Sequence, residues 1–440
     1  MRALLFASLL AATIVLSLPA PAGASTPAFS SGVLNFSLAN PTSIGFGPDE
    51  RLYVASQTDI RALSLDQGGL HVSSVETVAS ELNEITGIAF DPTAASPITV
   101  YASRREPSAT DGYEGRVSTF TAPSWTRQDI ITGLPNSTPY TNHYTNGLAF
   151  DTQGKLYIAQ GSDTDAGLSG PNYPETPLSA AILRADIHAP GFDGNVTYNP
   201  ATTPANDNVD QTGGDVQVYA AGTRNAYDLV VHSNGKIYAT DNGPAGPNTS
   251  TSCTTSGSGV SSADELNLIV QGNYYGFPNR NRGRSDARQC TYHAPEEGDG
   301  ADFTAPIHTF PAHCSCDGIA AYLSEAFGGS MQGDLVIAQL IFGNVVRVDL
   351  APDGLSVSSV TTLQAGYSNP LDVAVSPTGT IYIAEYGANQ ISYLTPAGVG
   401  GMTELPSISS RTTHSWTMMV AAAAIAAALS VAAMARRRRA

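Results

Sequence analysis

The sequence predicts an all-β protein, a six-bladed β-propeller flanked by an N-terminal signal peptide and a C-terminal transmembrane helix. A hairpin phrase that recurs six times is the main evidence for the propeller. The composition agrees, with 42 Gly, 28 Pro, 19 Tyr and 13 Phe among 440 residues, because these residues favour turns and strands over long helices. Length alone would allow two or three domains, but propellers form longer single domains.

The two ends of the chain have the features of export and membrane attachment. Residues 1–24 contain one Arg, an apolar run and a small-residue end, typical of a cleaved signal peptide; an uncleaved anchor is the alternative. Residues 416–435 form an uncharged run of 20 residues, long enough for a transmembrane helix, and Arg residues follow at once. A GPI signal and a bacterial sorting tail are alternatives for this segment. Each of them predicts attachment at the cell surface.

These ends give a division of the chain into five parts. They are a signal peptide (1–24), a six-bladed propeller (27–397), a Ser/Thr-rich stalk (398–415), a transmembrane helix (416–435) and a basic cytoplasmic tail (436–440). The predicted product is a single-pass surface protein with an extracellular N-terminal domain. Its formal net charge is −17, and removal of the five terminal Arg leaves −22 for the ectodomain. Such acidity argues against a nucleic-acid partner, because phosphate neutralisation needs clustered cations.

An exported chain can keep disulfides and carry glycans. A bridge between Cys314 and Cys316, one residue apart, would be strained, so we favour Cys253–Cys290 among the three possible pairings. A zinc site made of the CxC and His313 lacks a fourth ligand. Asn-x-Ser/Thr acceptors, which predict a glycoprotein, occur at Asn35, Asn136, Asn195 and Asn248.

The recurring phrase is an apolar strand, a turn rich in Asp, Pro, Asn and Gly, and a second strand with Tyr near its centre. Turn chemistry and alternation predict a β-hairpin. The six copies cover 43–56, 87–103, 147–160, 228–241, 321–339 and 372–385. Six similar hairpins indicate propeller blades rather than a β-sandwich. Binding and catalytic groups are then expected on loops at one end of the central channel.

Two loop segments carry candidate catalytic and binding side chains. His143 precedes one blade strand and Asp163 follows the next, so hairpin geometry places both at the same end of a sheet. A His beside a carboxylate can act as a general base, although such pairs are often structural. Arg224 and Asn225 stand at the entry of another strand, where Arg offers a fork of donors to a carboxylate or a quinone oxygen. The alternative for Arg224 is an ion pair.

Two further segments could bind a hard cation. The turn after 239–242 contains Gly243 and Pro244, whose backbone carbonyls could ligate Ca²⁺; a plain turn is the alternative. Asp264 and Glu265 precede a short apolar run, where they could bind Ca²⁺ or stabilise a strand junction.

Taken together, these motifs resemble the glucose/sorbosone dehydrogenase family. The matching strings are Asn142-His143, GLAFDTQGKLYIAQGSD, GTRN, DNGP, DELNLI, NYYGFP and HCSCDG, in one order over residues 35–395. Family members are sugar oxidoreductases that depend on pyrroloquinoline quinone (PQQ) and have six-bladed propellers. The resemblance therefore implies PQQ and calcium as cofactors.

The resemblance also implies roles for individual residues. His143 corresponds to the general base, Asp163 to its acidic partner, and Arg224 with Asn225 to the pair that holds the quinone oxygens. Asn142 is implied beside the cofactor. The carbonyls of Gly243 and Pro244 correspond to Ca²⁺ ligands, and Asp264 with Glu265 to a second Ca²⁺ region.

Two departures from the family pattern concern the same pocket. A family Arg that faces a PQQ carboxylate is absent from Ser368 to Asp372, and a family Gln that faces the sugar has no equivalent in Ser80 to Thr86. Arg104 and Arg105 are candidates to compensate.

The favoured hypothesis is a surface-anchored oxidoreductase that transfers hydride from a sugar or polyol hydroxyl to PQQ, with His143 as base. The alternatives are a non-catalytic extracellular propeller that binds a ligand or partner, and a Ca²⁺-dependent lactonase-type hydrolase. The hydrolase needs several carboxylates around one ion, with Asp163, Asp241 and Asp372 as the available candidates. The electron acceptor is unknown, because no haem-attachment CxxCH is present.

Overall fold

The computed structural model describes residues 27–66, 68–108, 112–136, 143–165, 167, 175–200, 208–244, 262–295 and 303–397. The predicted signal peptide, stalk, membrane segment and tail lie outside these ranges, as do Asn142 and Cys253. Within them, the structure contains no helix of the length and hydropathy that a membrane crossing requires.

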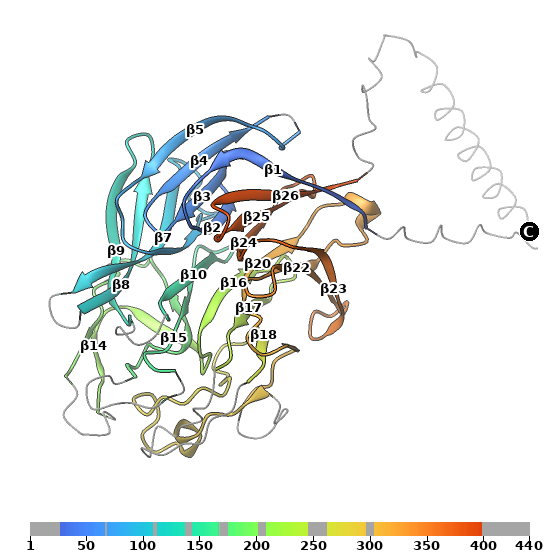
Figure 1. Cartoon of the computed structure of the whole chain (residues 1–440). Helices are drawn as coiled ribbons and strands as arrows, with labels where there is room; N and C mark the ends of the chain where they lie inside the picture. The colour runs from blue at the N-terminus through green and yellow to red at the C-terminus, as the bar shows by residue number, and fades with distance from the viewer. Residues whose placement is uncertain are drawn as a thin grey trace, which may run out of the picture. The chain divides into compact units, whose positions relative to one another are not determined.

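Six four-stranded antiparallel sheets follow one another along the chain and form the blades of a propeller (Figure 1). The first strands are β2 (Pro41–Phe46), β6 (Ile85–Ala89), β10 (Thr145–Phe150), β16 (Ala226–Val231), β20 (Cys316–Tyr322) and β24 (Pro370–Val375). The second strands are β3 (Leu52–Ser56), β7 (Thr99–Ser108), β11 (Leu156–Gln160), β17 (Ile237–Asp241), β21 (Asp334–Gln339) and β25 (Ile381–Glu385). The predicted six-bladed propeller is thus confirmed, and five of the six predicted hairpins form the first two strands of a blade. The copy predicted at 321–339 is displaced, because its first strand, β20, begins at Cys316 and ends at Tyr322.

The third and fourth strands form the outer half of each blade, and the sequence patterns did not predict them individually. The third strands are β4 (Ile60–Leu65), β8 (Gly112–Thr121), β12 (Ala181–Ala185), β18 (Asp264–Ile269), β22 (Asn344–Leu350) and β26 (Gln390–Pro396). The fourth strands are β5 (Val72–Ala79), β9 (Thr126–Leu134), β15 (Val216–Ala221), β19 (His308–Phe310), β23 (Val357–Ala365) and β1 (Phe29–Ser37). Smaller elements are β13 (Thr197–Tyr198), β14 (Gln211–Gly213) and 3₁₀ turns at Ala287–Cys290 and Ala326–Gly329.

The ring closes by pairing the two ends of the described chain. The first strand in sequence, β1, pairs antiparallel with β26, so the last blade combines residues from both ends. The six first strands contact one another in a closed circle around the axis. Because β1 lies at the outside of this blade, it completes the ring without leaving an unpaired strand edge at β26.

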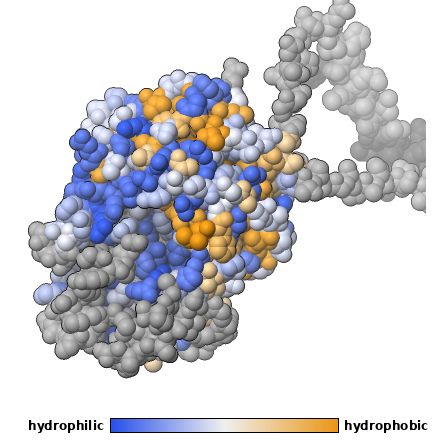
Figure 2. Space-filling model, in the orientation of Figure 1, coloured by the Kyte–Doolittle hydropathy of each residue, from blue (hydrophilic) through white to orange (hydrophobic). Residues whose placement is uncertain are grey.

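The second strands form the most buried layer of each blade. Every residue of β3, β11, β17, β21 and β25 is buried, because each blade packs between two others. Apolar clusters accordingly fill the spaces between adjacent blades. Outside the core, Figure 2 shows a hydrophilic area over β8 and β9. There Arg116 and Arg127 pair with Asp129 on the outer strands.

Side chains on the first strands link neighbouring blades around the channel. The side chain of the third residue in three of these strands accepts a backbone N–H of the next blade. Ser43 Oγ accepts from Ile88 (3.2 Å), Asp228 Oδ2 from Ile319 (3.2 Å) and Asp372 Oδ2 from Ile44 (2.8 Å). Glycine occupies the positions that face two of these carboxylates. A Cβ at Gly147 would meet Asp228 at 2.1 Å, and one at Gly318 would meet Asp372 at 2.3 Å. Glycine therefore lets the first strands approach closely at the axis.

Candidate active site

The end of the propeller at which the first strands begin is called the entry face here. The starts of the first and third strands lie on it, together with the ends of the second strands. The described parts of the loops singled out from the sequence all lie on this face, because they precede a first strand, follow a second strand or precede a third. The expectation that the candidate residues share one end of the channel is therefore confirmed for the described residues.

His143 is buried just before β10 and contacts Ser162, which follows β11. Its Nδ1 lies 2.8 Å from Ser162 Oγ, and that hydroxyl donates its single hydrogen to the carbonyl of Thr164 at 2.5 Å. Because the hydroxyl has no second hydrogen, His143 must be the donor at Nδ1. The Nε2 atom then carries the lone pair, and it makes no hydrogen bond with another described residue. Burial, followed by the charge of Arg224, lowers the pKa of His143 well below 6.5. The ring is therefore a neutral base.

Asp163 is not the hydrogen-bond partner of His143. Its Oδ2 accepts from the backbone N–H and the hydroxyl of Thr176, both at 2.9 Å, and its own N–H donates to Glu175 at 3.0 Å. Burial and the neighbouring Glu175 raise the pKa of Asp163 to about 7. Ser162 and Asp163 are consecutive residues that meet different neighbours, so only one of them reaches the imidazole. The predicted His143–Asp163 pair is wrong, and Ser162 takes that place.

Arg224 and Asn225 are held by a buried carboxylate at the end of β17. Asp241 accepts the backbone N–H of both residues, at 2.8 and 2.7 Å. The Arg224 side chain donates to the carbonyls of Asp165 (2.6 Å) and Asn242 (2.9 Å), and it pairs with the Asp165 carboxylate. Three of the five guanidinium N–H groups are thus used within the protein. Arg224 therefore forms the ion pair that was the alternative expectation, and it also lies in the candidate site.

The His143 and Arg224 loops meet at Gly161. A Cβ there would lie 2.7 Å from the Cβ of His143 and 2.9 Å from Asn225 Oδ1, so glycine is needed for the approach. The N–H of Ser162 donates to the Arg224 carbonyl at 2.8 Å. Asn225 Oδ1 also accepts from the Asn146 amide at 3.0 Å. The structure thus brings together the predicted base and the predicted pair.

The turn that follows β17 presents oxygen atoms beside Arg224. Asn242 Oδ1 is buried without a hydrogen-bond partner, and the Gly243 carbonyl accepts no hydrogen bond from a described residue. The Pro244 carbonyl accepts the N–H of Ser262 at 3.3 Å. Hard cations prefer such uncharged oxygen ligands combined with a carboxylate. The donor set at this turn therefore fits Ca²⁺, with Asn242 added to the predicted residues.

Asp264 and Glu265 do not converge on a common point. They are consecutive in β18, and successive side chains of a strand point to opposite faces. Asp264 Oδ1 accepts the N–H of Gly243 at 3.0 Å, whereas Glu265 accepts from the Asn267 amide at 2.8 Å. A second Ca²⁺ region at these residues therefore stays a prediction, and the two carboxylates would not bind one ion together. Asp264 instead supports the turn at Gly243, which is the first candidate Ca²⁺ site.

Cys314 and Cys316 form a disulfide, contrary to the expectation that strain would disfavour it. The backbone accommodates the bridge because His313 (φ 60°) and Ser315 (φ 47°) adopt left-handed conformations, which turn the chain sharply around each cysteine. Both sulfur atoms lie close to Asp264, but bridged sulfurs are not metal ligands. Cys290 is also disulfide-bonded, while its favoured partner, Cys253, lies outside the described residues.

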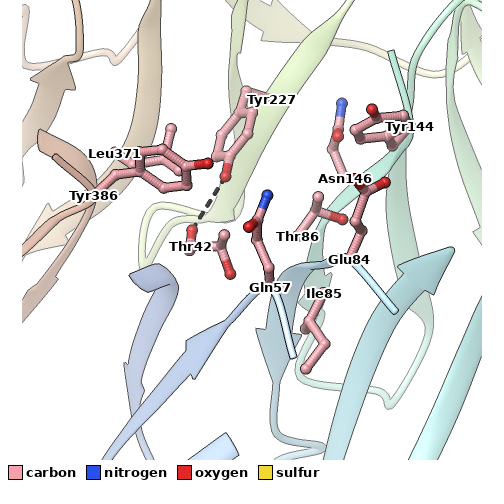
Figure 3. Close-up of a pocket in the computed structure, with 10 residues that line it drawn as sticks. All are labelled: Thr42, Gln57, Glu84, Ile85, Thr86, Tyr144, Asn146, Tyr227, Leu371 and Tyr386. Carbon is pink, nitrogen blue, oxygen red and sulfur yellow. Dashed lines mark hydrogen bonds between the residues drawn. The ribbon is translucent and has the colours of Figure 1, made fainter. Parts of the chain in front are cut away.

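A small cavity of about 130 Å³ opens at the channel mouth next to these loops (Figure 3). Five of its lining residues occupy the positions near the start of a first strand, where side chains face the axis. The lining residues are Thr42, Gln57, Glu84, Ile85, Thr86, Tyr144, Asn146, Tyr227, Leu371 and Tyr386. Tyr227 crosses the channel and donates to the carbonyl of Thr42 at 3.1 Å. The recurring phrase could have indicated the axis positions, because each stands immediately before its copy.

Arg105 contacts two residues that line this cavity, Glu84 and Tyr144, but Arg104 contacts neither. Arg105 donates to Glu84 at 2.8 Å and lies 3.6 Å from the ring centre of Tyr113 and 5.0 Å from that of Tyr144. Arg104 is fully buried inside its blade, where it pairs with Glu106 and Asp129. Of the two arginines considered as compensation, only Arg105 is therefore placed to act at the mouth.

The acidic groups required for a lactonase-type site do not gather around one point. Asp163, Asp241 and Asp372 belong to different blades, and each accepts backbone N–H groups. The described residues contain one group of three potential ligands, Asp264 with the two bridged cysteines. No carboxylate cluster therefore favours the hydrolase hypothesis in this part of the chain.

The fold and these loops agree with comparisons to known proteins. The model of the glucose/sorbosone dehydrogenase family matches residues 38–392, so the chain belongs to this family. The chain is 26% identical over 276 residues to quinoprotein glucose dehydrogenase B of Acinetobacter calcoaceticus, covering 57% of this chain and 52% of that protein. It thus spans about half the length of that relative.

Solved structures show the same fold at low identity. The apo form of the soluble aldose sugar dehydrogenase from Escherichia coli has a TM-score of 0.59 and 18% identity, covering 84% of this chain and 99% of that one. The PQQ-bound aldose sugar dehydrogenase from Streptomyces coelicolor has a TM-score of 0.54 and 20% identity, with the same coverage.

Proposed function

We propose that this protein is a PQQ-dependent dehydrogenase of a sugar or polyol that is attached to the cell surface. The observation that carries the proposal is the neutral His143, fixed with its Nε2 lone pair free, next to the Arg224–Asn225 pair. A dehydrogenase of alcohols needs such a base to remove the hydroxyl proton. Membership in the glucose/sorbosone dehydrogenase family supports the same activity.

The residues present fit the quinone end of PQQ and its cation. Arg224 and Asn225 would hold the quinone oxygens, using the guanidinium N–H groups that Asp165 and Asn242 leave unused. Asn242 Oδ1 and the Gly243 carbonyl would bind Ca²⁺. When bound, PQQ supplies a quinone carbon that accepts hydride, and Ca²⁺ polarises the quinone as a Lewis acid.

The protein's own residues supply the proton chemistry. We expect the substrate hydroxyl to bind within reach of His143 Nε2, which would take its proton as hydride leaves the carbon. Ser162 keeps the Nδ1 hydrogen in place, so the accepting nitrogen is always the one that faces the substrate. The buried imidazole is neutral at neutral pH, with its one hydrogen on Nδ1, so Nε2 is ready to accept a proton. One hydride, which carries two electrons, and one proton leave the substrate, which becomes a carbonyl or lactone.

The test is reconstitution of the full-length protein with PQQ and Ca²⁺. We expect a bound-quinone absorption spectrum and bleaching of an electron-acceptor dye when sugars or polyols are added. His143→Ala should abolish turnover while PQQ still binds, and Arg224→Ala should weaken PQQ binding. Absence of a bound spectrum with excess PQQ and Ca²⁺ would refute the proposal. Sugar binding without dye reduction would instead favour the non-catalytic propeller.

Surface attachment is proposed from the apolar segment 416–435 and the basic residues after it. Cell fractionation should recover the protein with membranes or the cell envelope, exposed to external protease. Recovery of a protease-protected protein inside the cell would refute it.

A further inference from the structure

Two carboxylates connect the Cys314–Cys316 loop to the turn at 242–243. Asp264 Oδ1 accepts the N–H of Gly243 at 3.0 Å, and its Oδ2 accepts the N–H of Cys316 at 3.3 Å. Asp317 Oδ1 accepts from the Asn242 amide at 2.8 Å, and its Oδ2 accepts from Ser315 Oγ at 2.8 Å. Each carboxylate thus has one oxygen on the cysteine loop and the other on the turn.

The disulfide determines the shape of that loop. His313 and Ser315 are held at positive φ, a conformation that residues other than glycine rarely adopt. The Cys314 sulfur lies 3.2 Å from Asp264 Oδ2, so the bridge also fills the space behind this carboxylate. Without the cross-link, both backbone positions can relax to ordinary conformations. Asp264 and Asp317 then lose the fixed partners on their cysteine side.

The turn on the other side is sensitive to such a change. A Cβ at Gly243 would meet the carbonyls of Ala263 and Ser262 at 2.4 and 2.6 Å, so its backbone is closely packed. Among the described residues, the Gly243 carbonyl and Asn242 Oδ1 accept no hydrogen bond that would fix them. Their orientation therefore depends on the bonds that Asp264 and Asp317 make to the same two residues.

From these contacts we infer that the Cys314–Cys316 disulfide is a positioning element for a Ca²⁺ site at the 242–243 turn, acting through Asp264 and Asp317. The inference rests on the proposed function for the identity of the cation. The bridge is reversible in principle. A dithiol reductant supplies two electrons and two protons, its own thiols become a disulfide, and Cys314 and Cys316 become thiols. Reduction then lowers the affinity for Ca²⁺.

The experiment is a calorimetric Ca²⁺ titration of the full-length protein and of C314S/C316S. We expect the double variant to bind Ca²⁺ about 10- to 100-fold more weakly, the usual effect of losing a residue behind a metal ligand. Wild-type protein treated with dithiothreitol should show the same loss and recover on reoxidation, while C314S/C316S should not respond. The matched control is C253S/C290S, which leaves Cys314 and Cys316 in place and should retain wild-type affinity.

Each outcome discriminates. Equal Ca²⁺ affinity of wild type and a folded C314S/C316S would overturn the inference. If C314S/C316S does not fold, Asp264→Asn is titrated with the disulfide intact. Asp264→Asn must bind Ca²⁺ more weakly than wild type, and unchanged Ca²⁺ affinity would also overturn the inference. A wild type that oxidises sugar with PQQ but has no Ca²⁺ affinity overturns the inference alone. A wild type that binds neither PQQ nor Ca²⁺ overturns the proposed function as well.

Discussion

At the scale of single residues, the direction of one hydrogen bond decides which nitrogen of His143 can accept a proton. Ser162 donates to Thr164, so it can only accept from His143, and Nε2 is left as the base. Sequence reasoning found His143 from its position before a strand. It assigned the orienting role to Asp163, because a carboxylate is the commoner partner of a catalytic imidazole. Only the packing of the loop around Glu175 and Thr176 shows that Asp163 is occupied elsewhere.

Replacing Ser162 with Ala should lower kcat about 10- to 100-fold, less than the roughly 10²- to 10⁴-fold that general-base catalysis contributes as a whole. The reason is that the imidazole could then place its hydrogen on either nitrogen. PQQ affinity should stay within about twofold of wild type, since the hydroxyl makes no contact with Arg224. Ser179→Ala is the matched control, because that hydroxyl binds Glu175 and Thr176 rather than His143. Unchanged kcat in Ser162→Ala would refute the orienting role.

His143 also determines how kcat falls at acidic pH. His143 must be unprotonated to act as base, and burial lowers its pKa well below 6.5. The kcat of the holoenzyme should therefore stay high as pH falls to 6.5 and decline only at lower pH. A decline already centred above 6.5 would contradict this assignment. The measurement is kcat between pH 4.5 and 8 with a dye whose own reduction is independent of pH.

At the scale of elements, the tyrosine of each repeated hairpin does not have one fixed role. Tyr53 and Tyr157 donate to an Asp of their own turn, whereas Tyr382 donates to the Gly69 carbonyl of the next blade at 2.6 Å. In the weakest copy the second strand has no Tyr. There Tyr322, at the end of the first strand, donates to the next blade instead, at Gly379. The repeat could be recognised from its alternation, but the partner of each hydroxyl depends on which turn the adjacent blade brings near.

Tyr382→Phe should therefore lower the free energy of unfolding by about 1–2 kcal/mol, because the hydroxyl is lost and the Gly69 carbonyl is left without this donor. Tyr101→Phe is the control. Tyr101 occupies the equivalent strand position, and its hydroxyl has no hydrogen bond among the described residues. Chemical denaturation of both variants checks the difference. Equal stability of the two variants would show that the inter-blade bond contributes nothing measurable.

At the scale of the whole molecule, the axis is lined by buried carboxyl groups from consecutive blades. Burial raises the pKa of Asp317 and Asp372 to about 7 and that of Asp228 well above 3.8. The charge of Asp372 raises the pKa of Asp228 further, and that of Asp317 raises the pKa of both. No single blade creates this environment. It appears only when six first strands converge and exclude water from the channel.

These carboxyl groups predict a pH dependence of stability. Their folded pKa values lie above the unfolded value of 3.8, so between about pH 4 and 7 the folded state binds more protons. The stabilisation is complete below the unfolded pKa and is lost as pH rises through about 7. For the protein without cofactor, the free energy of unfolding should fall by about 1–2 kcal/mol from pH 5 to 7. Urea titrations measure this, and Asp372→Asn should reduce the slope. A slope that is flat or rises with pH would contradict the assignment.

The sequence by itself determined the six hairpins and the loops that carry His143, Arg224, Asn225 and Gly243. Both follow from local signals, namely turn chemistry, strand alternation and the order of short motifs. Tertiary structure alone decided the partner of His143, the separation of Asp264 from Glu265 and the bridging of Cys314 to Cys316. It also placed Gln57, Glu84 and Tyr386, from three blades, around one cavity. The physical reason is that side-chain direction and contacts between blades depend on how the ring closes, and no local pattern records that.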